Sequence, residues 1–238
     1  MQGLFNDIED WFKSLPIFTR YWFGGSVLLT LLGRFRLVNT YWFILTWDTF
    51  ISKFHIWRPV TALFYYPIGF HFLINLYYLY RYSLALEKGV FDGRPADYLF
   101  MLIFNWLLSV IVALFLQMSV LMDLMVMSVL YVWCQINKDA IVYFWFGIRL
   151  KAMYLPWVLF GFNLILATDW VDELCGILIG HIYFFLMFKY PPGLRRPQPP
   201  LHPRHPVLLV PQQMGQGSAG LWPGPSARRR RFLGRQRS

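Results

Sequence analysis

The stretch DELCGILIGHIYFF, residues 172–185, combines the features that decide the fold. Two adjacent carboxylates, Asp172 and Glu173, open an apolar run that contains Gly176 and Gly180 before a histidine. Glycines four residues apart clear one face of a helix, so a neighbouring membrane helix can approach closely. Acidic side chains at the start of a helix are favoured by its dipole. The stretch predicts a closely packed membrane helix and raises the question whether its polar residues form a catalytic site.

The composition of the whole chain is that of a membrane protein. Of 238 residues, 57% are hydrophobic and 14% are charged, whereas about 25% of the residues in a soluble domain are charged. A membrane-spanning helix needs roughly 17–25 apolar residues. Six spans are predicted, at residues 17–37, 59–80, 98–116, 120–136, 154–168 and 171–188. The sequence therefore predicts an all-α fold, a polytopic six-helix membrane bundle.

Segments of different composition precede and follow this bundle. Residues 4–15 place apolar side chains on one helical face and charged ones on the other, and Pro16 ends the pattern. Such a pattern is typical of a helix lying in the membrane interface. The C-terminal segment holds ten of the 15 prolines and six glycines, which predicts disorder. The predicted divisions are an interfacial helix over 1–16, a membrane domain over 17–189 and a disordered basic tail over 190–238.

The positive charge of the chain lies in its tail. Residues 1–188 carry 12 basic and 12 acidic side chains, whereas ten basic and no acidic ones follow. This distribution argues against a nucleic-acid-binding core. Cytosolic loops of membrane proteins are enriched in Lys and Arg. With both termini in the cytosol, 18 of the 22 basic residues lie on that side, so a cytosolic location is predicted for both termini.

Four strings within the predicted membrane domain resemble the Derlin family, whose members are inactive relatives of the rhomboid intramembrane proteases. They are IWRPVT (56–61), FDGRPADY (91–98), MSVLYVW (127–133) and GILIGHIYFFLMF (176–188). The resemblance covers about residues 8–190. It implies a rhomboid-like bundle in the endoplasmic reticulum membrane, and it assigns Trp57 and Arg58 to a Trp-Arg element that shapes a luminal loop.

The catalytic residues of a rhomboid protease have no full counterpart here. That family needs a serine within Gly-x-Ser-x-Gly on its fourth helix and a histidine within His-x-x-Gly-x-x-x-Gly on its sixth. By this resemblance Ser128 keeps the serine position, but Val126 and Leu130 replace both glycines. Glu173 occupies the histidine position. Because a serine without a positioned base is a weak nucleophile, the sequence predicts a catalytically inactive pseudoprotease.

The histidine of the opening stretch does not restore the missing base. His181 lies eight residues after Glu173, which is about 12 Å along a helix. No Cys, His or carboxylate cluster has metal spacing around it. We therefore expect a hydrogen-bonded packing histidine, and the sequence indicates neither a metal nor a cofactor.

Other polar residues fall inside the predicted spans, where such side chains normally face the bundle interior or a hydrated cavity. These residues are His71, Asn75, Asn105, Asp123, Ser128 and Asn163. Together they permit a hydrated groove. The span at 154–168 has fifteen residues, about 22 Å against a hydrocarbon core of roughly 27–30 Å. A short span of this kind predicts local thinning of the bilayer.

The resemblance also implies a function and partners. Derlins act in endoplasmic-reticulum-associated degradation and the unfolded protein response, where they recognise misfolded luminal or membrane proteins and assist their retrotranslocation to the cytosol. Expected partners are these misfolded proteins, a ubiquitin ligase complex, the valosin-containing AAA ATPase, and further copies of this chain or its relatives. Phe232 and Gly234 resemble a tail box that binds the ATPase, although the arginines around them depart from the family pattern. Two alternatives stay open, an active rhomboid-type protease and a purely structural adaptor for the ligase and the ATPase.

Overall fold

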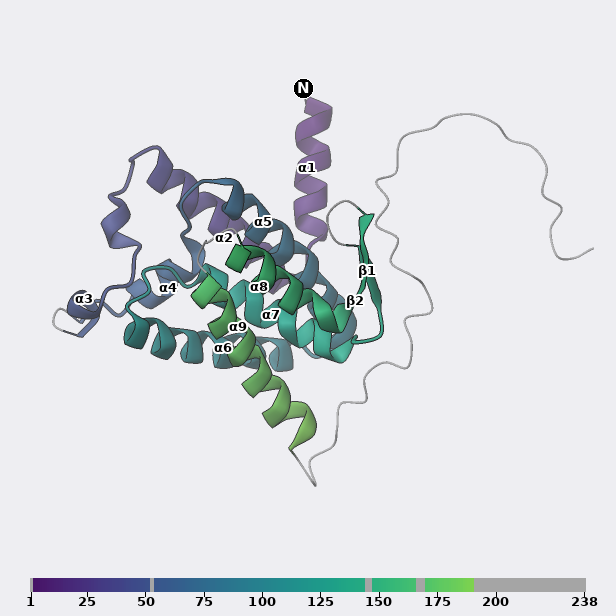
Figure 1. The fold of residues 1–238 in the computed structure, drawn as a ribbon. Helices are drawn as coiled ribbons and strands as arrows, with labels where there is room; N and C mark the ends of the chain where they lie inside the picture. Colours follow the sequence, from purple (N-terminus) through teal and green to yellow (C-terminus); the bar gives the residue numbers. More distant parts are fainter. Residues whose placement is uncertain (1, 52–53, 144–146, 166–169, 191–238) are drawn as a thin grey trace, which may run out of the picture. The chain divides into compact units, whose positions relative to one another are not determined.

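The computed structural model describes residues 2–51, 54–143, 147–165 and 170–190. The predicted tail, with Phe232 and Gly234, lies outside the described residues from position 191 onward. The chain is mostly helical, which confirms the sequence-based prediction. The helices are α1 (Gln2–Ser14), α2 (Ile17–Arg34), α3 (Trp47–Ile51), α4 (Arg58–Phe64), α5 (Phe70–Tyr78), α6 (Pro95–Leu116), α7 (Met122–Ile136), α8 (Leu155–Ile165) and α9 (Trp170–Phe184) (Figure 1).

A small hairpin departs from the all-α prediction. Strands β1 (Ile141–Tyr143) and β2 (Arg149–Lys151) pair antiparallel, with Val142 opposite Leu150. Short 3-10 and π-helical turns connect or extend the α-helices. They are the 3-10 turns Thr40–Trp42 and Ala152–Tyr154 and the π-helical turns Leu79–Ser83, Leu86–Val90 and Phe185–Lys189.

Two of the described helices are long and apolar enough to cross a membrane. They are Pro95–Leu116, with a mean hydropathy of 2.6, and Trp170–Lys189, with a mean hydropathy of 1.6. Two shorter apolar helices cover Met122–Ile136 and Ala152–Ile165. These helices indicate a membrane protein, while the number of spans and the location of the termini stay predictions.

The second predicted span, residues 59–80, is wrong as a continuous helix. The chain forms α4 and α5 there, separated by an extended connection around Pro67. Proline has no amide N–H to continue the helical ladder and disfavours helical geometry in the residue before it. The freed amide of Tyr66 donates a hydrogen bond to the hydroxyl of Thr30 on α2, at 3.3 Å. The amide freed at the break therefore has its hydrogen-bond partner on a neighbouring helix.

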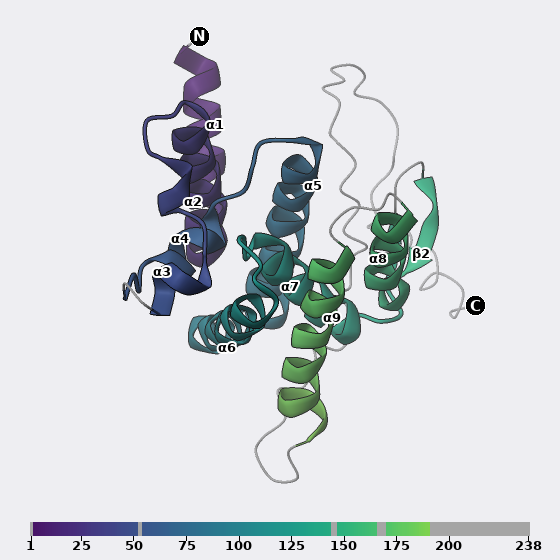
Figure 2. The same ribbon diagram turned by 60° about the vertical axis from the view of Figure 1, so that its left-hand side comes forward.

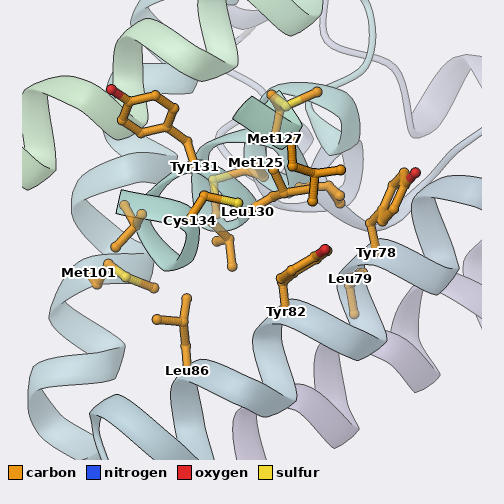
Figure 3. Close-up of a cluster of buried hydrophobic side chains, with 14 of the residues drawn as sticks. Tyr78, Leu79, Tyr82, Leu86, Met101, Met125, Met127, Leu130, Tyr131 and Cys134 are labelled. Carbon is orange, nitrogen blue, oxygen red and sulfur yellow. The ribbon is translucent and has the colours of Figure 1, made fainter. Parts of the chain in front are cut away.

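Helix α7 lies in the middle of the bundle, with α5, α6, α8 and α9 around it (Figures 1 and 2). Twelve of its fifteen residues are buried, and a helix buried on nearly all sides must pack against neighbours all round. The main core cluster combines α7 with α5, the π-helical turns that follow α5, and α6. Figure 3 shows members of this cluster, among them Tyr78, Tyr82, Met101, Met125, Leu130 and Cys134.

A partly buried acid, Glu87, caps the beginning of α2. Glu87 accepts hydrogen bonds from the backbone amides of Phe18 and Thr19, at 3.0 and 2.8 Å, and from the Thr19 hydroxyl. The first amides of a helix have no partner within the helix, and Pro16 at the N-cap supplies no side-chain cap. Glu87 takes that role and is favoured there by the helix dipole. The contact joins α2 to the turn 86–90.

A candidate polar cavity in the helix bundle

Four helices enclose a small cavity with polar walls. It measures about 50 Å³ and lies among α5, α7, α8 and α9. A water molecule needs roughly 10–15 Å³ on this measure, so the cavity has room for a few. Its polar lining consists of His71, Asn75, Tyr78, Asp123, Asn163 and Glu173. The remaining lining is apolar.

Each carboxylate in the cavity is paired with an amide from another helix. Asn75 on α5 donates to the carboxylate of Asp123 on α7. Asn163 on α8 donates to the carboxylate of Glu173 on α9, and its amide oxygen lies 3.3 Å from Nε2 of His71. Burying a charge without hydrogen bonds is costly. These pairs therefore stabilise two acids inside an apolar bundle.

Local sequence spacing places these groups on the cavity side. His71 and Asn75 are four residues apart, so they share one face of α5. Asp123 lies in the first turn of α7, and Glu173 lies in the first turn of α9. Both acids therefore sit where a helix dipole favours negative charge. The cavity is therefore a place where polar groups from four helices meet.

Ser128 and Glu173, the two positions of the rhomboid dyad, occupy different surroundings. Ser128 is fully buried in α7, and its hydroxyl donates to the carbonyl of Met125 at 2.9 Å. It does not line the cavity, whereas Glu173 does. Among the described residues, no group of three His, Cys, Asp or Glu side chains could hold a metal ion.

Gly176 and Gly180 lie where α9 crosses α7. A Cβ built at Gly176 would stand 2.7 Å from Cβ of Met127 and 2.8 Å from the Leu124 carbonyl oxygen. A Cβ at Gly180 would stand 2.7 Å from the carbonyl oxygen of Ser128. Real Cβ atoms essentially never come so close, so only glycine fits both positions at this helix separation. This contact holds Glu173 at the cavity.

His181 lies one residue beyond Gly180 and belongs to the same crossing. Its Nδ1 is 2.8 Å from the hydroxyl of Tyr131 on α7, and the two rings meet edge to face. His181 is absent from the cavity lining. The side chain acts as a hydrogen-bonded packing residue between α7 and α9, on the outer side of the helix pair.

Trp57 and Arg58 lie at the start of α4, away from the cavity. Arg58 is 1% exposed; its guanidinium donates to the Ile44 carbonyl at 3.1 Å and lies 4.6 Å from the Tyr41 ring centre. Trp57 is 44% exposed and stacks on His55, with ring centres 4.5 Å apart. The arginine thus fixes the loop from inside, while the tryptophan presents an aromatic surface outward.

Asn105, a polar residue inside a predicted span, takes no part in the cavity or in the crossing of α7 and α9. It lies fully buried on α6 and does not line the cavity. Neither of its amide atoms has a hydrogen-bond partner among the described residues. The structure offers no physical account of this residue.

Sequence reasoning missed the pairing within the cavity and the role of Glu87. Asn75 and Asp123 are 48 residues apart, and Glu87 is 68 residues from Thr19. The helical period shows on which side of its own helix a residue lies. It does not show which other helix packs against that side. The available signal was the presence of polar side chains in several apolar spans.

Comparisons with known proteins show similarity of this chain to one family. A family model described as the Der1-like family matches residues 15–196. Derlin-1 of Bos taurus is 55% identical over 193 residues, which cover 79% of this chain and 77% of that protein. Derlin-1 of Caenorhabditis elegans is 54% identical over 189 residues, covering 78% and 77%. Derlin-1 of Drosophila melanogaster is 44% identical over 188 residues, covering 77% and 76%.

Proposed function

This chain belongs to the Der1-like family, and from that premise we propose that it is a non-catalytic membrane protein of endoplasmic-reticulum-associated degradation. In this proposal it recognises misfolded luminal or membrane proteins and assists their passage to the cytosol. It spans the endoplasmic reticulum membrane several times, and both termini face the cytosol.

The polar cavity among α5, α7, α8 and α9 is the observation that carries this proposal. Polar and acidic side chains are expensive inside a membrane and mark pathways or binding sites there. Here amides and carboxylates from four helices converge on one hollow. An unfolded polypeptide carries unpaired backbone N–H and C=O groups, which need partners when they enter hydrocarbon. The cavity brings donors and acceptors together, and its amides and carboxylates would exchange their present partners for the backbone groups of such a segment.

A short helix beside the cavity supports local thinning of the bilayer. Helix α8 has 11 residues, about 16 Å in length, against roughly 27–30 Å of hydrocarbon. With the 3-10 turn before it, the helical stretch covers Ala152–Ile165. A thinner bilayer would reduce the distance over which a polar chain lacks water. Thinning and the polar cavity would both lower the free-energy cost of moving a polar chain across the membrane.

The surroundings of Ser128 support a function without catalysis. Its hydroxyl is bound to a carbonyl within its own helix, and the fully buried side chain does not reach the cavity. At the position of the rhomboid base stands Glu173, which accepts a hydrogen bond from Asn163. A carboxylate near a developing oxyanion would oppose its stabilisation, because an oxyanion needs donors.

The proposed partners follow from the proposed activity. Misfolded proteins occupy the membrane domain, a ubiquitin ligase complex modifies them, and the valosin-containing AAA ATPase extracts them. Phe232 and Gly234 in the tail would contact the ATPase. Assembly with further copies of this chain or its relatives would extend the path that one copy provides.

Client turnover in cells that lack the endogenous protein tests this proposal. The cells are complemented with the wild type or with Asn163→Leu/Glu173→Leu, which makes one side of the cavity apolar. The half-life of a misfolded luminal client is measured by cycloheximide chase and normalised to inserted protein. We expect a longer client half-life in the variant. An unchanged half-life at equal insertion would favour the adaptor alternative.

A further inference from the structure

An open groove runs along the outer side of α5, next to the polar cavity. It measures about 510 Å³, within the roughly 300–1,000 Å³ of sites that hold a small organic ligand. Its walls are apolar and aromatic. They include Phe70, Leu73, Ile74 and Tyr78 from α5, faced by Tyr143 of β1 and Leu155 of α8.

One arginine lines this groove, and a second contacts one of its lining residues. Arg81 lines it and donates a hydrogen bond to the Tyr77 hydroxyl at 2.9 Å, and Arg149 lies over the ring of Tyr143, 5.6 Å from its centre. Within the described part of the chain, neither arginine forms an ion pair with a carboxylate. A guanidinium presents five donors in a planar fork that suits phosphate oxygens. The end of the groove is therefore an unpaired cationic site.

The dimensions of the groove match one leaflet of a membrane. Phe70 and Arg81 are eleven residues apart, which is roughly 16 Å along a helix and about half of a 30 Å hydrocarbon core. Between these ends lies the ring of Tyr78, which is 6% exposed and lines the groove.

We propose that this groove binds a phospholipid with an anionic headgroup. The net negative headgroup contacts Arg81 and Arg149, and one acyl chain lies along the apolar face of α5. Basic pockets between membrane helices on the cytosolic side bind anionic headgroups, and Arg81 and Arg149 lie on the side predicted to be cytosolic. This lipid site adjoins the proposed client path, because Phe70, Ile74 and Tyr78 line both hollows.

Photo-crosslinking with lipids tests the proposal. The full-length protein is reconstituted in phosphatidylcholine vesicles that contain a trace of phosphatidylserine or phosphatidylcholine with a diazirine on one acyl chain. Labelled peptides are identified by mass spectrometry. We expect phosphatidylserine to label the peptides that contain Leu73 and Leu155 more than phosphatidylcholine does. Each arginine lost should lower this preference about fivefold, so Arg81→Gln/Arg149→Gln should abolish it.

Two controls separate this site from general lipid contact. Lys138→Gln removes an exposed charge that does not line the groove, and it should leave the preference unchanged. An apolar groove lined by Tyr21, Leu63 and Leu99 has no charged lining, and both lipids should label it equally. Glycerophosphoserine, which has the headgroup but no acyl chain, should not compete. Equal labelling of the α5 groove by both lipids, labelling by neither, or a preference that survives loss of both arginines would overturn the proposal.

Discussion

The carbonyl oxygen of Ser128 on α7 lies so close to Gly180 on α9 that a Cβ at position 180 would stand 2.7 Å from it. The serine that a rhomboid protease would use as a nucleophile thus contributes its backbone to helix packing. Its hydroxyl is bound to the carbonyl of Met125 in the same helix. The crossing of α7 and α9 forms a structural frame beside the cavity.

Alanine substitutions at the glycines test this crossing. Gly180→Ala and Gly176→Ala should lower the thermal unfolding temperature of the detergent-solubilised protein, measured by tryptophan fluorescence. The added Cβ meets a backbone carbonyl at each site, which cannot move aside as a side chain can. Overpacking of this kind costs about 1–3 kcal/mol.

Gly161→Ala is the matched control for both substitutions. Gly161 lies in α8, and nothing lies within 4 Å of a Cβ placed there. Alanine is the better helix former by about 1 kcal/mol, so this variant should keep or raise the unfolding temperature. Equal effects at all three glycines would show that the α7–α9 contact is not the cause.

Apolar substitutions in the cavity separate stability from function. Asn75→Leu removes the donor to the buried carboxylate of Asp123, and loss of such a partner costs about 1–3 kcal/mol or more. Asn75→Leu/Asp123→Leu removes both groups and should unfold at a higher temperature than the single variant. Client turnover should slow in both variants, because both remove polar groups from the path. If the double variant restored client turnover together with stability, polarity would not be the property that matters.

A cleavage assay tests the absence of catalysis. The purified protein should give no product from a generic rhomboid substrate, and Ser128→Ala should leave client half-life unchanged. Glu173→His alone should not restore cleavage, because Val126 and Leu130 still replace the glycines around the serine. Any product that disappears with Ser128→Ala would refute the pseudoprotease interpretation.

Much of the fold could be predicted because a long apolar run in a sequence indicates a helix. The predicted spans 98–116 and 120–136 agree closely with α6 and α7. The string Asp92–Pro95 has residues that favour a turn, and there Gly93 adopts a φ of 71° and Pro95 starts α6. Hydropathy averages over a window, however, and therefore missed the break at Pro67 between α4 and α5.

The arrangement of the cavity could be predicted only in part. Polar residues in spans predict an interior or hydrated location, and His71, Asn75, Asp123 and Asn163 do line the cavity. Their pairing depends on which helices become neighbours, which a single sequence does not give. Glu173 was expected only at the start of its helix and in the position of the lost base. Its carboxylate also accepts a hydrogen bond from the Asn163 amide.

Substitutions in the tail test recruitment of the ATPase. Deletion of residues 226–238 should reduce recovery of the valosin-containing AAA ATPase with the protein and leave membrane insertion intact. Phe232→Ala/Gly234→Ala should have the same effect if these residues form the binding box. If instead changing Arg228–Arg231 to serine reduces recovery and raised salt mimics the loss, the segment acts by electrostatic attraction, which salt screens.

Crosslinking of a client from inside the cavity tests whether clients pass along the polar groups of α5, α7, α8 and α9. A photoreactive phenylalanine analogue is placed at Phe162, which lines the cavity, or at Leu164, which is 48% exposed and does not. The chain is then irradiated in native membranes with a luminal degradation client stalled in transit. We expect a client crosslink from position 162 that disappears when the client is degradation-competent and released, and a much weaker one from position 164. Equal crosslinking from both positions, or none from position 162 while the client is stalled, would contradict it.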